Sequence, residues 1–180
     1  MAKAALLING QIRTFAQCFP VFVEKIIKEN PEYEWDVFCI VNTTPDIKRT
    51  CSAPRILPVY NFKYLKIEES DPVLPDLSYQ YDHYINKEWD PDNDCRVKKH
   101  YICAFYQLYW MKELMKQVPG GYDFSVRLRT DTMLSSTIKL RELDPGKIWI
   151  PIGNSFGGYN DRLAVGGGEL MRTYMNRFYY

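Results

Sequence analysis

The residues with the clearest potential for chemistry lie in the segment Arg127-Leu128-Arg129-Thr130-Asp131. Apolar and polar residues alternate from Phe124 to Thr130, and this strand pattern puts Arg127, Arg129 and Asp131 on one side. Two guanidinium groups can neutralise a diphosphate, and a terminal carboxylate can hold a divalent ion that phosphates and water also ligate. The segment therefore predicts a nucleotide diphosphate site. An Arg–Asp ion-pair network on an exposed sheet face is the structural alternative.

A second candidate segment, Asn9-Gly10-Gln11-Ile12-Arg13-Thr14, follows the first apolar run of the chain. It offers a backbone turn at Gly10, an amide at Gln11 and a cation at Arg13. In open α/β sheets, ligands bind outside the carboxyl ends of the strands, which is where this turn would lie. The structural alternative is a plain strand-to-helix junction in which Gln11 or Thr14 caps the helix.

A third segment is rich in glycine, with Gly157 and Gly158 before Asp161 and residues 166–168 after it. Glycines of this kind either form a flexible connection or let the backbone approach a sugar ring closely. In the second case Asp161 would face the substrate and act as a base or as an orienting group.

Several familiar sites are excluded. No GxGxxG, GxxxxGK[ST] or GxSxG pattern occurs, so the dinucleotide fingerprint, the P-loop and the hydrolase elbow are all missing. Cys95, His100 and Cys103 lack the close cysteine pair and the fourth ligand of a zinc site. Residues 90–94 resemble the start of a calcium loop without its glycine and glutamate, so the acidic pair at Asp92 and Asp94 is interpreted as a helix-capping turn.

Composition sets the class of protein. The 180 residues fit one domain, 1–180, with 46% hydrophobic and 25% charged residues and a net charge of +1. This balance predicts no nucleic-acid partner, because no chain-wide positive field exists. No apolar run is long enough for a membrane span, and five cysteines without close pairs favour a reducing compartment. We expect a cytoplasmic domain.

The pattern of elements predicts the fold. Strands are expected at residues 4–8, 35–42, 55–60, 124–130 and 147–152, and helices at 14–30, 96–118 and 169–180. Pro20 suits only the first turn of its helix. Residues 61–94 show no sustained period and predict a long loop or lid. Strands that alternate with helices predict an α/β domain with a mostly parallel central sheet flanked by helices. Because the last helical pattern reaches the end of the chain, other domains of a longer polypeptide are expected.

The three candidate segments together resemble GT-A type glycosyltransferases. In particular, residues 6–15, 127–131 and 158–166 are similar to the amino-terminal glycosyltransferase domain encoded by large viruses of chlorella-like algae, which build their own capsid glycans. The resemblance covers nearly the whole chain. It implies a nucleotide-binding α/β sandwich, a nucleoside diphosphate sugar donor, above all a uridine diphosphate sugar, and a glycan acceptor in the host cytoplasm.

The resemblance also implies residue roles. Asp131 would bind a divalent metal, Mn²⁺ or Mg²⁺, and Gly10, Gln11 and Arg13 would line the nucleotide with Arg127 and Arg129 nearby. Asp161 would be the catalytic group beside the donor sugar or the acceptor hydroxyl. The usual Asp-x-Asp is reduced here to Arg129-Thr130-Asp131, so Arg129 could replace part of the metal's charge.

Other functions remain open on these residues. A nucleotidyltransferase shares the phosphate and metal chemistry, but residues 9–14 lack the lysine of its loop. A catalytically silent carbohydrate-binding or assembly module would use the tyrosine-rich residues 61–94 for stacking. A methyltransferase would need a glycine-rich first turn that the chain does not have.

Overall fold

The computed structural model describes residues 1–12, 14–42, 61–68, 95–153 and 160–176, and for residues 95–102 it describes the backbone only. The elements follow one another in the order β1 (Ala2–Gln11), α1 (Phe15–Phe22), η1 (Val23–Ile27), β2 (Tyr33–Asn42), β3 (Tyr64–Glu68), α4 (Cys95–Lys116), β4 (Phe124–Arg129), η4 (Leu140–Glu142), β5 (Leu163–Gly167) and α5 (Gly168–Tyr174). All five strands join a single sheet.

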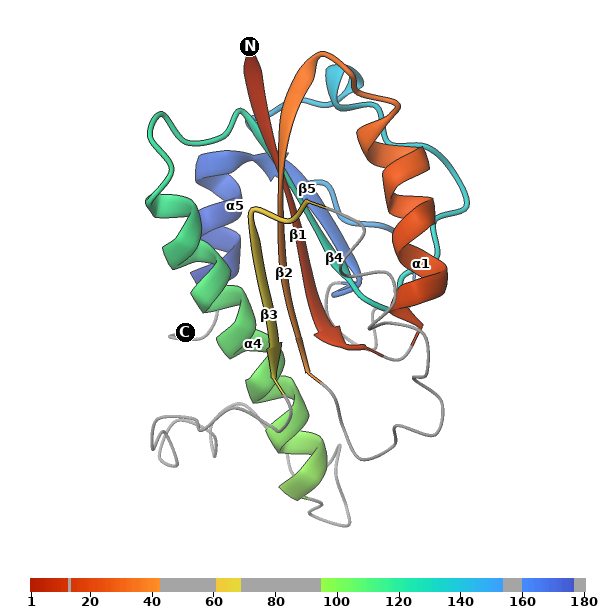
Figure 1. Cartoon of the computed structure of the whole chain (residues 1–180), viewed down its shortest axis with the longest axis vertical. Coiled ribbons are helices and arrows are strands. Elements are labelled where there is room, and N and C mark those ends of the chain that lie inside the picture. The colour runs from red at the N-terminus through yellow and green to blue at the C-terminus, as the bar shows by residue number, and fades with distance from the viewer. Residues whose placement is uncertain (13, 43–60, 69–94, 154–159, 177–180) are drawn as a thin grey trace.

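The sheet has the strand order β3-β2-β1-β4-β5, with β1 in the centre (Figure 1). β1 pairs in parallel with β2 and β4, and β2 pairs in parallel with β3. Of the described strands, only β5 runs antiparallel, against β4. The carboxyl ends of β1, β2, β3 and β4 therefore meet at one edge of the sheet, which we call the carboxyl edge. The expected mostly parallel α/β sheet is confirmed.

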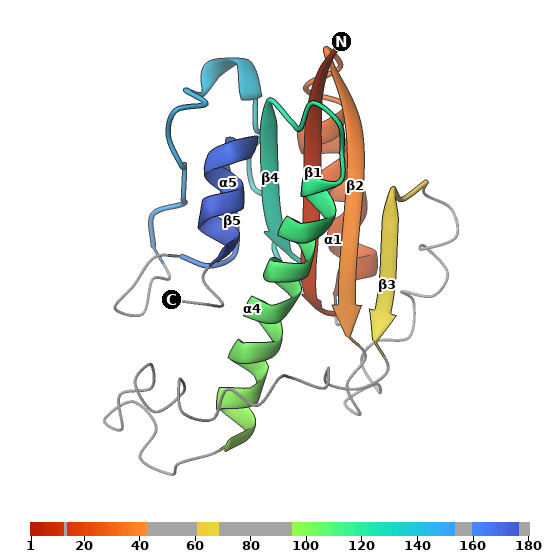
Figure 2. The ribbon, with the colours of Figure 1, turned by 90° about the vertical axis from the view of Figure 1, so that its left-hand side faces the viewer.

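Helices cover both faces of the sheet. Figure 2 shows α4 and α5 on one face and α1 on the other. Alternate residues of β1 divide between the two cores: Leu6 and Ile8 pack with α1, whereas Ala5 and Leu7 pack under α4. Because β1 is covered on both sides, its residues 4–8 are wholly buried, which explains the continuous apolar run in the sequence. No helix among the described residues has the length and apolar character that a membrane span needs.

The predicted elements differ from the structure at two places. The strand expected at residues 55–60 lies outside the described residues and stays a prediction. In the long loop expected at residues 61–94, Tyr64–Glu68 form the strand β3. The expected loop was therefore wrong for β3, an edge strand of five residues. The rest of the expected loop, residues 69–94, lies outside the described residues. The strand expected at residues 147–152 shrinks to one bridge between Trp149 and Val165, because a turn engages the Lys147 amide and Pro151 has no amide hydrogen.

The first helix also differs in detail. α1 begins at Phe15, so Pro20 lies beyond the first turn that we expected it to occupy. A proline removes an i→i−4 hydrogen bond and crowds the preceding turn. Directly after α1, the helix widens into the π-helical turn η1 over Val23–Ile27, where the Lys28 amide donates to the Val23 carbonyl at 3.0 Å. The helix predicted for residues 14–30 is thus present as α1 followed by η1.

The glycines at the end of β5 allow close contact with the protein's own backbone. A Cβ at Gly167 would lie 2.5 Å from the carbonyl oxygen of Pro145, and one at Gly168 would lie 2.2 Å from that of Tyr122. The close backbone approach that these glycines allow is thus made, at Gly167 and Gly168, with the protein's own backbone. Gly157 and Gly158 lie outside the described residues. Gly167 and Gly168 fix how the start of α5 packs against the turn before β4.

Gly168→Ala should lower the free energy of unfolding by about 3 kcal/mol, because a backbone carbonyl cannot move aside for the new methyl group. Gly146→Ala is the matched control, since its Cβ would meet only the Asp144 side chain, at 3.1 Å. We expect the control to lose less than about 1 kcal/mol. Urea denaturation followed by tryptophan fluorescence measures both; equal losses would contradict the packing described here.

Candidate functional site

The ends of three strands are tied together at the carboxyl edge. The Thr130 amide donates to the Asn9 carbonyl at 3.1 Å, and the Ile12 amide donates to the Asn42 carbonyl at 3.1 Å. The Thr130 hydroxyl donates to the carbonyl of Gln11. These contacts bring the first and second candidate segments side by side.

Gly10 makes this approach possible. Its φ of +126° is a conformation that other residues rarely adopt, and a Cβ there would lie 3.2 Å from the Thr130 hydroxyl oxygen. Gly10 and Gln11 are both partly exposed at the edge. Arg13, the third residue expected to line a nucleotide, lies outside the described residues.

Arg127 takes a structural position. Its side chain is only 2% exposed, and its Nε donates to Asn9 Oδ1 at 2.9 Å. Asn9 is itself buried and donates through Nδ2 to the Ala104 carbonyl of α4 at 3.3 Å. Arg127 lies on the predicted side of β4, but at a depth that keeps it from contact with a bound diphosphate in this conformation.

Arg129 lies between two carboxylates. Its Nε and Nη2 donate to the two oxygens of Asp131 at 3.0 and 2.9 Å, and its Nη1 donates to Asp161 Oδ2 at 3.0 Å. The three side chains are 35%, 31% and 46% exposed, so the cluster is open to solvent on one side. The structure thus joins three of the predicted site residues, including Asp161 from the loop before β5.

Sequence reasoning missed the residues that position Asp161. The side chain of Asn160 is 6% exposed; it donates to the Gly153 carbonyl at 2.8 Å and accepts the Arg162 amide at 2.9 Å. The Arg162 carbonyl accepts from the Arg129 amide at 3.0 Å and from the Thr132 hydroxyl at 3.0 Å. Arg162 is therefore held to the end of β4, and Asn160, on the other side of Asp161, is held to Arg162 and Gly153.

The cluster carries one positive and two negative groups. Burial works against the charged guanidinium, but the hydrogen bonds and charges of Asp131 and Asp161 outweigh it and raise the pKa of Arg129. Arg129 is thus a permanent cation. The charge of Asp131 also acts on Cys18 in α1. Burial raises the pKa of the Cys18 thiol, the hydrogen bond to the Thr14 hydroxyl lowers it, and the charge of Asp131 raises it further.

The contacts of Asp131 test the divalent metal that the resemblance implies. Hard divalent cations take about six oxygen ligands, yet both oxygens of Asp131 already accept from Arg129. Among the described residues, no three His, Cys, Asp or Glu side chains are grouped to hold a metal. The arrangement does not fit a divalent ion at Asp131.

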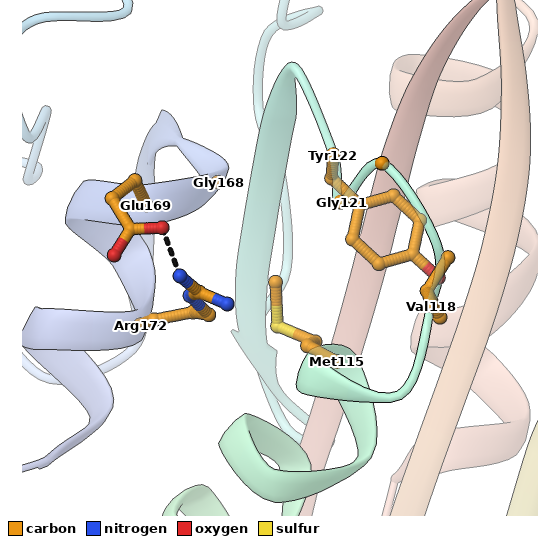
Figure 3. Close-up of a pocket in the computed structure, with 8 residues that line it drawn as sticks. Met115, Val118, Gly121, Tyr122, Gly168, Glu169 and Arg172 are labelled. Carbon is orange, nitrogen blue, oxygen red and sulfur yellow. Dashed lines mark hydrogen bonds and ion pairs between the residues drawn. The ribbon is translucent and has the colours of Figure 1, made fainter.

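A cavity of about 310 Å³ lies at the other end of β4, away from the carboxyl edge (Figure 3). None of the predicted site residues lines it; its polar lining centres on the ion pair between Glu169 and Arg172 of α5. The cavity is therefore separate from the place where the predicted side chains meet. The carboxyl edge remains the candidate site.

Comparison with known families adds little to this geometry. Residues 106–178 match the model of a domain of unknown function, DUF7796. This stretch contains β4, β5, α5 and the second half of α4, and so includes Arg129, Asp131 and Asp161, but it covers less than half of the chain. No curated protein matches the chain.

Asn9→Ala should lower the free energy of unfolding by about 3 kcal/mol, because it removes a hydrogen-bond acceptor from a buried guanidinium. Thr132→Val removes one neutral hydrogen bond at the same edge and should cost about 1 kcal/mol. Chemical denaturation of the two variants gives the comparison. A loss at Asn9 no larger than that at Thr132 would mean that Arg127 does not depend on Asn9.

Proposed function

We propose that this chain is a glycosyltransferase that moves a sugar from a nucleoside diphosphate sugar, above all a uridine diphosphate sugar, to a glycan acceptor. The observation that carries the proposal is the convergence at the carboxyl edge. Two carboxylates from separate segments, Asp131 and Asp161, meet on one guanidinium beside the turn at Gly10 and Gln11. Open α/β sheets bind their ligands at this edge. The resemblance to GT-A type enzymes supplies the reaction class.

In this proposal the donor lies across the ends of β1 and β4. Gly10 and Gln11 line the nucleotide. A guanidinium carries five N–H groups, and the contacts of Arg129 with the described residues use three of them. The remaining two donate to the diphosphate, whose negative charge grows as the bond to the sugar breaks. Arg129 therefore stabilises the leaving group, while Asp131 holds the guanidinium in place.

Asp161 serves the acceptor. Its Oδ2 is held by Arg129, and its other oxygen has no hydrogen-bond partner among the described residues. That oxygen takes the proton of the acceptor hydroxyl as the hydroxyl oxygen forms a bond to the anomeric carbon. The bond from that carbon to the diphosphate breaks, and the diphosphate leaves with the electron pair. Asn160 holds the loop in which Asp161 lies, so it acts as a positioning residue.

One observation favours a second candidate, a catalytically silent carbohydrate-binding module. Asp131, Arg129 and Asp161 already form a set of ion pairs, which is also what a structural cluster on a sheet edge would look like. The two candidates differ in a measurable way, because the module binds sugars without consuming a nucleoside diphosphate sugar.

Calorimetric titration of the 180-residue chain with uridine and guanosine diphosphate sugars tests donor binding. We expect micromolar affinity for one nucleotide family. Asp161→Asn should keep that affinity within about threefold and lower turnover by at least about a hundredfold, because an amide cannot take the acceptor's proton. Turnover is followed as release of the nucleoside diphosphate.

Asp144→Asn is the matched control, since Asp144 lies in a separate turn and is bound to the Gly146 amide. It should retain the activity of the unmodified chain. Binding of sugars without turnover would favour the silent module. No binding of any donor by a folded sample would refute the transferase.

A further inference from the structure

The guanidinium of Arg129 occupies the place where a cation bridging Asp131 and Asp161 would lie. Asp131 is bound through both oxygens, in the fork-to-fork arrangement that suits a guanidinium and a carboxylate. Asp161 is bound through one oxygen, on the other side of the same group. The two carboxylates therefore share one positive charge that belongs to the chain.

Arg129 is also fixed from its backbone. Its amide donates to the Arg162 carbonyl at 3.0 Å, and its carbonyl accepts the Thr132 amide at 3.1 Å. The side chain is 35% exposed, so most of its surface is covered by protein. A group held in this way does not need to be recruited from solution, unlike a metal ion.

A divalent ion would compete poorly for this place. To bind Asp131 it would have to break two charge-assisted hydrogen bonds of 3.0 and 2.9 Å. It would also come within a few ångströms of a cation whose pKa is raised and which cannot lose its proton. Like-charge repulsion then acts against the ion for as long as Arg129 is present.

We propose that Arg129 is the built-in cation of this site, so that Asp131 and Asp161 are ligands of a guanidinium and binding of a divalent metal at Asp131 is blocked. Removal of the guanidinium converts the same two carboxylates into a divalent-cation site. The part of the proposal that concerns metal binding rests only on the contacts of Arg129 with Asp131 and Asp161. The consequence that donor binding is independent of metal rests on the proposed function.

Titration of the folded chain with Mn²⁺ alone, followed by electron paramagnetic resonance of the free ion, tests the proposal. The unmodified chain should bind Mn²⁺ weakly. Arg129→Met should bind it at least about tenfold more tightly, because two carboxylates become available. The double variant Arg129→Met with Asp131→Asn should return to the affinity of the unmodified chain.

Arg172→Met is the matched control. Arg172 is also paired with a carboxylate, that of Glu169, and its side chain is 31% exposed against 35% for Arg129, but it lies at the other end of the sheet. This variant should not gain affinity for Mn²⁺. An equal gain in the two arginine variants would overturn the proposal, since any unpaired carboxylate would then suffice.

A second measurement keeps the proposal open to refutation if Arg129→Met does not fold. Asp131→Asn in the otherwise unmodified chain should leave Mn²⁺ affinity unchanged, because Asp131 is not a metal ligand while Arg129 is present. Loss of Mn²⁺ binding in this variant would overturn the proposal. Titration of the donor with and without a chelator tests the consequence for the proposed function. Unchanged donor affinity extends the proposal to the transferase. Failure to bind any donor contradicts the proposed function but does not affect the Mn²⁺ result.

Discussion

The parallel pairing of β1 with both β2 and β4 is the constraint on which the rest of the structure depends. Residues 4–8 of β1 are wholly buried, and their side chains alternate between a core under α1 and a core under α4. A shift of register by one residue would exchange the two cores, so burial on both faces fixes the pairing. Because all three strands run in one direction, their last residues emerge together. The location of the candidate site therefore follows from backbone direction before any polar side chain is considered.

The two arginines of β4 show how one strand face serves two purposes. Arg127 and Arg129 are two positions apart and share a face, yet Arg127 is 2% exposed and Arg129 is 35% exposed. The inner arginine is held by Asn9, which also binds the carbonyl of Ala104 and so links β1, β4 and α4. The outer arginine reaches past the end of the sheet to Asp131 and Asp161. The two residues are of the same type, so their distance from the carboxyl edge decides that Arg127 stabilises the fold and that Arg129 is accessible to a ligand.

Much of the fold was predictable from the sequence because burial leaves a continuous or periodic apolar pattern, as in β1, β2 and α4. β3 was missed because an edge strand of five residues leaves Leu65 and Ile67 38% and 43% exposed, and so has no buried run to detect. At the site, alternation predicted a shared side for Arg127 and Arg129, which both lie in β4, but Asp131 lies in the turn after the strand, where alternation no longer applies. Alternation also carries no information about depth. The contact between Arg129 and Asp161 spans 32 positions and depends on how β5 returns to the sheet. Asn9, at the end of an apolar run, was the one available signal of a buried polar link, because a buried amide needs partners.

The reversed direction of β5 determines which loops can reshape the candidate site. For strands that run with β1, the connection after the strand reaches the carboxyl edge. β5 is antiparallel, so its first residue, Leu163, lies at that edge beside Leu128, and its last, Gly167, lies beside Phe124 at the opposite one. The loop before β5 is therefore the one that delivers Asp161, whereas the glycine-lined junction after it is closed by backbone contacts. At the junction after β5, a longer connection would have to break the close backbone contacts of Gly167 and Gly168, so insertions there should destabilise the fold.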